Sequence, residues 1–124
     1  MNVPDLFSKV PLFEGLSPAD RIALSRAATV RSYRRGERIV TQGQAGDSFF
    51  VLVKGRVAVS ILSPEGREVV LSTLSTGDYF GEMALLDEAP RSATVTAAER
   101  SELAVLTREA FFDLVVATFR EHGA

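Results

Sequence analysis

The sequence predicts a mainly β domain, a β-roll or jelly-roll barrel with an N-terminal helix, a short internal helix and a C-terminal helix. Two observations lead to this fold class. Short runs rich in Val, Ile, Leu, Thr and Phe follow one another through the middle of the chain. Turns that contain glycine separate these runs, and many short strands joined in this way are typical of β sandwiches and barrels. The separating glycines are Gly36, Gly43, Gly46, Gly55 and Gly77.

The chain has the size and composition of one globular domain. Its 124 residues lie within the common range for single domains, and a content of 46% hydrophobic and 24% charged residues excludes a disordered chain. We therefore expect a single domain over residues 1–124. It comprises a helical lead at 1–29, a barrel at 30–106 and a C-terminal helix at 107–124.

The helical lead contains a clear helix start. Ser17 supplies a capping hydroxyl, Pro18 occupies the first helical position, and Asp20 follows the serine by three residues. These signals predict a helix over residues 17–28, within which Ala19, Ile22, Ala23 and Ala27 recur at helical spacing. Before it, the apolar segment Val10–Phe13 is expected to pack back onto the domain.

The barrel strands are predicted from the apolar runs themselves. Val57, Val59 and Ile61 alternate with smaller or polar residues, which is the pattern of a half-buried strand. Ser63-Pro64-Glu65-Gly66 has the chemistry of a turn that joins two strands. The predicted strands are Val30–Tyr33, Glu37–Thr41, Ser48–Lys54, Arg56–Leu62, Arg67–Leu74, Ser92–Ala97 and Glu102–Leu106.

The last segment returns to a helical pattern. Thr107 is a candidate cap, and an apolar face then recurs at helical spacing. The residues of that face are Ala110, Phe111, Leu114, Val115 and Thr118.

Composition excludes several classes of function. The chain has no cysteine and one histidine, His122, so cysteine-based metal or redox sites, histidine-rich metal sites and Ser-His-Asp catalysis lack their residues. A net charge of −2 gives no basic field for nucleic acid. The first residues do not resemble a secretory signal, and no apolar run approaches the ~18 residues of a membrane span. We expect a cytoplasmic protein that is not an enzyme, inserts into no membrane and needs no cofactor or metal.

One segment, residues 77–95, interrupts the strand pattern and carries the candidate binding chemistry. Good helix formers over Glu82–Leu86 predict a short helical turn, and a helix start offers unpaired N–H groups. Gly81 lets a ligand approach the backbone, and Arg91, stiffened by the preceding proline, can grip phosphate oxygens in pairs. Glu82 is able to accept a hydrogen bond from a sugar hydroxyl. This set of groups fits a nucleotide held by its phosphate and its ribose.

Phe80-Gly81-Glu82-Met83-Ala84-Leu85-Leu86, followed by Pro90-Arg91-Ser92-Ala93-Thr94-Val95, resembles the phosphate-binding cassette of cyclic-nucleotide-binding domains. We place the cassette at residues 80–95. The glycine-rich stretch from Gln42 to Val57, the N-terminal helical lead and Arg108-Glu109-Ala110-Phe111 are also similar to that family, so the resemblance covers about residues 10 to 120. The sensor half of bacterial Crp/Fnr-type regulators looks most similar, and kinase or channel sensors stay open.

The resemblance implies a role for individual residues. Glu82 would accept the ribose 2′-hydroxyl, Arg91 would pair with the cyclic phosphate, and Gly81 would permit the turn. Backbone N–H groups at Met83, Ala84 and Ala93 would also reach the phosphate. Ser92 would add a hydroxyl for the phosphate or a syn guanine, while Leu71 and Leu74 would form the apolar wall for the base.

Other interpretations compete with this one. A domain that has lost nucleotide binding and serves protein contacts or dimerisation is the main alternative, although the presence of both Glu82 and Arg91 argues against it. A metal-dependent enzyme of the cupin type would need several histidines. No DNA-binding, kinase, cyclase or channel region follows the barrel in this sequence, so we expect either an excised sensor domain or a domain that acts on a partner. The expected partners are a second copy in a homodimer, an effector domain or a separate effector protein. The choice between cyclic AMP and cyclic GMP stays open, with cyclic AMP favoured.

Overall fold

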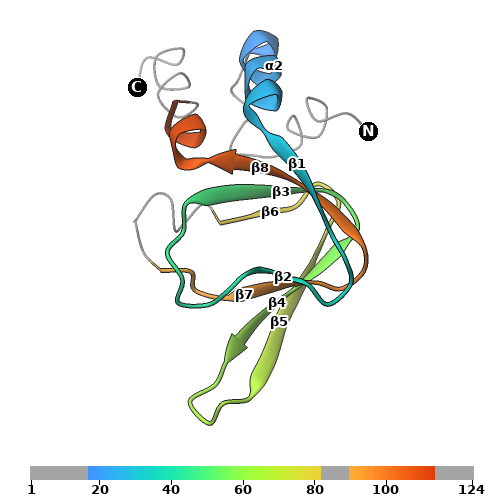
Figure 1. Ribbon diagram of the computed structural model, residues 1–124, viewed down its shortest axis with the longest axis vertical. Helices are drawn as coiled ribbons and strands as arrows, with labels where there is room; N and C mark the ends of the chain where they lie inside the picture. Colours follow the sequence, from blue (N-terminus) through green and yellow to red (C-terminus); the bar gives the residue numbers. More distant parts are fainter. Residues whose placement is uncertain (1–16, 82–89, 114–124) are drawn as a thin grey trace.

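The computed structural model describes residues 17–81 and 90–113. Two four-stranded antiparallel sheets make up most of this part of the chain and face one another (Figure 1). One sheet has the strand order β1-β8-β3-β6 and the other the order β2-β7-β4-β5. The strands are β1 (Thr29–Tyr33), β2 (Arg38–Val40), β3 (Ser48–Lys54), β4 (Arg56–Leu62), β5 (Glu68–Ser75), β6 (Tyr79–Phe80), β7 (Thr94–Ala97) and β8 (Ser101–Thr107). The predicted β-roll is confirmed.

Helix α2 (Pro18–Ala27) begins where the capping signals predict. The Ser17 hydroxyl accepts a hydrogen bond from the Asp20 N–H at 3.1 Å, and Pro18 is the first helical residue. The apolar residues that predict the helix do not anchor it, because Ala19, Ile22, Ala23 and Ala27 are all exposed. Leu24 is the buried residue of this helix. Leu24 packs in one cluster with Phe49 of β3 and Phe111, and these contacts set the orientation of the helix.

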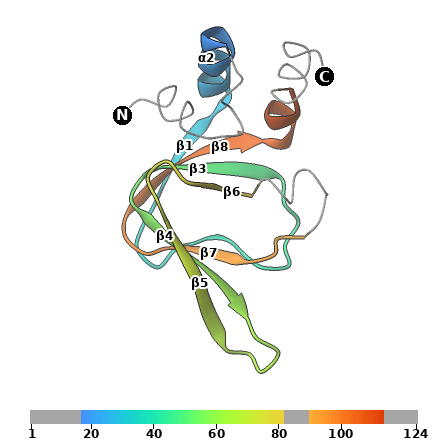
Figure 2. The ribbon, with the colours of Figure 1, turned by 180° about the vertical axis from the view of Figure 1, so that it is seen from behind.

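Residues 108–113 form the start of the second flanking helix, and the Thr107 hydroxyl accepts from the Ala110 N–H at 3.2 Å, as the capping prediction requires. This helix and α2 lie together on the outer side of the β1-β8-β3-β6 sheet (Figures 1 and 2). The part of its predicted apolar face from Leu114 onward lies outside the described residues. So do His122, the segment Val10–Phe13 and the turn predicted at Glu82–Leu86.

Strands β3 and β8 carry the core because both of their faces are buried. Phe49 of β3 points toward the helices and packs with Leu24 and Phe111, whereas Phe50 points between the sheets. Burial on both faces accounts for the continuous apolar run of β3 in the sequence. The cluster between the sheets, called here the inter-sheet cluster, contains Val40, Phe50, Leu52, Val57, Val95, Leu103 and Val105.

Several strand ends shift by one residue from the prediction, and two larger differences bear on the site. Tyr79 and Phe80 form β6, which pairs with β3 through Phe50 opposite Phe80, so the strand pattern continues into residues that the sequence analysis placed outside it. The stacked rings of Phe50 and Phe80, with centroids 4.8 Å apart, hold this short strand in place. β7 begins at Thr94, which leaves Ser92 and Ala93 in the bend before it.

The hairpin of β4 and β5 projects beyond the rest of the barrel (Figure 1). Its turn is the predicted one, because the Gly66 N–H donates to the Ser63 carbonyl at 2.9 Å. Among the described residues, no helix has the length and apolar character needed to cross a membrane.

Candidate functional site

Arg91 is a buried cation at the junction of the two sheets. Its side chain is only 7% exposed, and its guanidinium lies over the ring of Phe50, 5.7 Å from the centroid. Nη2 donates to the Ser48 carbonyl at 2.7 Å, and Nη1 donates to the Gly81 carbonyl at 3.2 Å. A buried charge of this kind is rare unless it has partners, and here backbone oxygens serve as such partners.

The backbone of Arg91 is fixed as firmly as its side chain. Its N–H donates to the Gln44 carbonyl at 2.7 Å, and its carbonyl accepts from the Gly43 N–H at 2.8 Å. Pro90 and Ala45 form a β-bridge beside these bonds. The glycine-rich loop after β2 therefore sets the position of Arg91, which explains why distant parts of the sequence belong to one site.

Gly81 is required by the geometry around Arg91. Its φ of 97° lies in the left-handed region that favours glycine. A Cβ at this position would lie 2.6 Å from Nη1 of Arg91 and 3.0 Å from the Ser48 carbonyl oxygen. Glycine thus permits both the turn and the close approach of the guanidinium.

The structure brings some of the remaining predicted site residues together. Leu74 is half-buried and packs against the inter-sheet cluster, which includes the Phe50 ring under Arg91. Leu71 does not join it. The β4–β5 register shifts between Val59 and Ser60, Leu71 is the extra residue on β5, and its side chain is 58% exposed.

Ser92 and Ala93 follow Arg91 directly, Ser92 exposed and Ala93 half-buried. Glu82, Met83 and Ala84 lie outside the described residues, so their assigned roles stay predictions.

Sequence reasoning missed Ser48 and Phe50 as partners of Arg91. Ser48 acts through its backbone carbonyl, which carries no signal of residue type, and Phe50 looks like any other apolar strand residue.

A second arginine ties the same loop to the C-terminal helix. Arg108, the first helical residue, donates from Nη2 to the Gly46 carbonyl at 2.8 Å, and its N–H donates to the Asp47 carbonyl at 3.1 Å. Asp47 precedes Ser48, whose carbonyl accepts from Arg91. The segment Gly46–Ser48 is therefore held from one end by Arg91 and from the other by Arg108.

Comparison with known proteins gives a consistent result. The family model for the cyclic nucleotide-binding domain matches residues 30–117. A cAMP-dependent protein kinase regulatory subunit from Mycosarcoma maydis is 52% identical over 89 residues, which are 72% of this chain and 17% of that protein. The chain thus spans about a sixth of that relative's length.

Solved structures show the same fold. The regulatory domain of Toxoplasma gondii PKA, crystallised with cAMP, superposes with a TM-score of 0.86 at 27% identity, covering 98% of this chain and 47% of that one. The catabolite activator protein of Thermus thermophilus has a TM-score of 0.80 at 36% identity, covering 86% of this chain and 50% of that one.

Proposed function

This chain is a member of the cyclic nucleotide-binding domain family, and from that premise we propose that it is a regulatory module that binds cyclic AMP in preference to cyclic GMP. Such a module binds a ligand and carries out no reaction. The observation that carries the proposal is the buried guanidinium of Arg91, set between the carbonyls of Gly81 and Ser48.

The geometry explains how Arg91 would respond to a cyclic phosphate. A charged phosphate oxygen is a stronger acceptor than a neutral carbonyl, so a bound phosphate would compete with Gly81 and Ser48 for the guanidinium. The cation is already desolvated and oriented, so little ordering is needed on binding. In this proposal Glu82 accepts the ribose 2′-hydroxyl, and Met83, Ala84, Ser92 and Ala93 line the phosphate.

The proposed output is a movement of the flanking helices. Competition at the Ser48 carbonyl would act on Gly46–Ser48, the segment that also accepts two hydrogen bonds from Arg108. A ligand shifts such an equilibrium by its different affinity for the two arrangements. The partner is an effector domain or protein, and the relatives suggest two classes, a protein kinase and the output part of a transcriptional regulator.

Calorimetric titration with cyclic AMP and cyclic GMP side by side tests the proposal. We expect both to bind, with cyclic AMP favoured by less than about tenfold, or about 1.4 kcal/mol. The phosphate and ribose are common to both ligands, and Leu74, the half-buried residue assigned to the base wall, would give an apolar contact to either purine. A thousandfold preference would show a specific base reader.

The same titration distinguishes the proposed function from the main alternative, which is a domain that no longer binds nucleotide. One observation favours that alternative, because Arg91 already has backbone acceptors and can be explained as a structural cation. If neither nucleotide gives heat of binding, and neither changes the NMR spectrum of the protein, the alternative would be established and the proposed function refuted.

A second prediction concerns the ribose. Glu82→Ala should weaken cyclic AMP binding by roughly 10- to 150-fold, the value of one hydrogen bond to a charged group. It should barely change the affinity for 2′-deoxy cyclic AMP, which has no hydroxyl to donate. Glu65→Ala, in the exposed β4–β5 turn, is the matched control and should leave both affinities unchanged. Equal losses for the two ligands would mean that Glu82 acts by holding the turn.

A further inference from the structure

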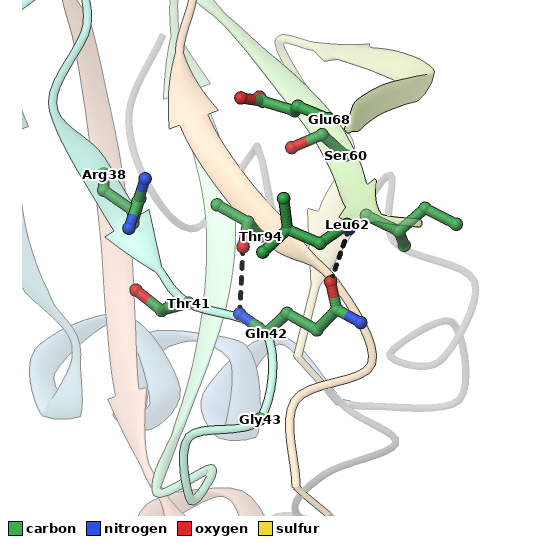
Figure 3. A pocket seen from close by; sticks show the side chains of 9 residues that line it. Arg38, Thr41, Gln42, Gly43, Ser60, Leu62, Glu68 and Thr94 are labelled. Carbon is green, nitrogen blue, oxygen red and sulfur yellow. Dashed lines mark hydrogen bonds between the residues drawn. The ribbon is translucent and has the colours of Figure 1, made fainter. Parts of the chain in front are cut away.

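A cavity of about 360 Å³ lies on the β2-β7-β4-β5 sheet. Val59 and Val95 are cross-strand partners that belong with the inter-sheet cluster, and the next pair along, Ser60 and Thr94, lies on the opposite face of the sheet. The cavity is therefore on the outer face. Its lining includes Arg38, Gln42, Ser60, Leu62, Glu68 and Thr94, and does not include Gly81, Arg91, Leu71 or Leu74 (Figure 3).

The cavity is held in shape by its own hydrogen bonds. The N–H of Gln42 donates to Oγ1 of Thr94 at 3.0 Å, and Oε1 of Gln42 accepts from the Leu62 N–H at 2.8 Å (Figure 3). These bonds connect the loop after β2 with β7 and β4. The floor is thus preformed, as small-molecule sites usually are.

Ser60 is the clearest sign that this cavity takes a ligand. Ser60 is only 2% exposed, and it lines the cavity. Its hydroxyl makes no hydrogen bond with any residue in the described part of the chain. Asp20 Oδ2 is the side-chain atom of the described residues that is fully buried without a partner, so the Ser60 hydroxyl keeps a small accessible surface. That surface faces the cavity, where the hydroxyl can donate to a bound molecule.

Two opposite charges border the same cavity. Arg38 comes from β2 and Glu68 from β5, the two outer strands of the sheet, and both are exposed. Within residues 17–81 and 90–113 neither side chain forms an ion pair. In Figure 3 Arg38 lies on one side of the cavity, and Ser60 and Glu68 lie on the other. A purely anionic ligand would be attracted by Arg38 and repelled by Glu68, whereas a ligand with both charges satisfies both groups.

The cavity also has an apolar side. Leu62, which lines the cavity opposite Glu68 in the β4–β5 register, is 59% exposed, and Ile61 beside it also lines the cavity. These side chains leave apolar surface in water beside the polar lining. A ligand with a short aliphatic group would cover it.

We propose that this outer cavity is a binding site for a zwitterionic small molecule of amino-acid type. Arg38 binds its carboxylate, Glu68 binds its ammonium group, the Ser60 hydroxyl donates to the carboxylate, and Leu62 packs against its aliphatic part. The site is separate from the proposed nucleotide site and does not depend on it.

Four probes of graded chemistry test the proposal on the unmodified chain. L-leucine carries both charges and an aliphatic group, 4-methylpentanoate lacks the ammonium group, 3-methylbutylamine lacks the carboxylate, and glycine lacks the aliphatic group. Amide chemical shifts are followed by NMR as each probe is titrated. We expect leucine to shift the amides of Ser60, Leu62 and Thr94 and to bind about tenfold or more tightly than the two single-charge analogues, because each lacks a charge-assisted hydrogen bond.

Variants identify the residues responsible. Arg38→Gln and Ser60→Ala should each weaken leucine binding, while Arg35→Gln, an arginine in the neighbouring exposed turn, should not. Arg91→Ala should leave leucine binding unchanged, which separates this site from the nucleotide site. No shift with leucine, equal binding of leucine and both single-charge analogues, or shifts confined to other parts of the barrel would overturn the proposal.

Discussion

Replacing Arg91 by alanine is expected to weaken cyclic nucleotide binding by about 30- to 5,000-fold. Removing one partner of a desolvated charge pair costs about 2–5 kcal/mol, which corresponds to that range. Arg91 is the buried cation of the described site, and its fork of donors matches phosphate oxygens. Calorimetric titration with cyclic AMP measures the effect directly.

The same substitution should also lower the free energy of unfolding, because Arg91 is part of the structure. The carbonyls of Ser48 and Gly81 would each lose a donor, and an unsatisfied buried carbonyl costs roughly 1–3 kcal/mol. We still expect a folded domain, since the inter-sheet cluster does not depend on the guanidinium for its apolar packing. Urea unfolding followed by circular dichroism separates this loss from the loss of binding.

Two further variants serve as controls for the affinity of Arg91→Ala. Arg91→Lys keeps the charge but not the planar fork, so its affinity should lie between those of the native protein and the alanine variant. Arg56→Ala removes an exposed arginine that forms an ion pair with Glu99, and the variant should bind nucleotide normally. A folded Arg91→Ala protein with native affinity would remove the phosphate role of Arg91.

The strands and caps could be predicted from the sequence because local chemistry determines them. The apolar run of β3, the turn at Ser63–Gly66 and the caps at Ser17 and Thr107 each depend on residues close together in the chain. The orientation of α2 could not be predicted, because it depends on Phe49 and Phe111, which are far away in sequence. For the same reason the short strand β6 was missed, since stacking on Phe50 holds it.

The candidate site shows the same division. Gly81 and Arg91 stand out in the sequence, and the structure places them in contact. The acceptors for Arg91 and the bonds that fix its backbone come from residues 43–48 and are mostly main-chain groups, which no side-chain pattern reveals. The exposure of Leu71 follows from a register shift within the hairpin, and the sequence of β5 carries no local signal for that shift.

Replacing Gly81 by alanine should impair both stability and nucleotide binding. A non-glycine residue at positive φ costs about 1–2 kcal/mol, and here the new Cβ would also lie 2.6 Å from Nη1 of Arg91. The guanidinium must therefore move away from the Gly81 carbonyl. We expect binding of cyclic AMP to weaken by at least about tenfold, because a guanidinium displaced by the new Cβ would make one charge-assisted hydrogen bond fewer to the phosphate.

Gly77→Ala is the matched control for this prediction. Gly77 has a similar φ of 94°, but a Cβ there would have no atom within 4 Å. Both variants should therefore lose similar backbone stability, and only Gly81→Ala should lose affinity. Equal affinities in the two variants would show that the guanidinium can leave the Gly81 carbonyl without cost to binding. The close approach at Gly81 would then be a feature of the ligand-free fold alone, and the role of Arg91 would rest on the Ser48 side of the site.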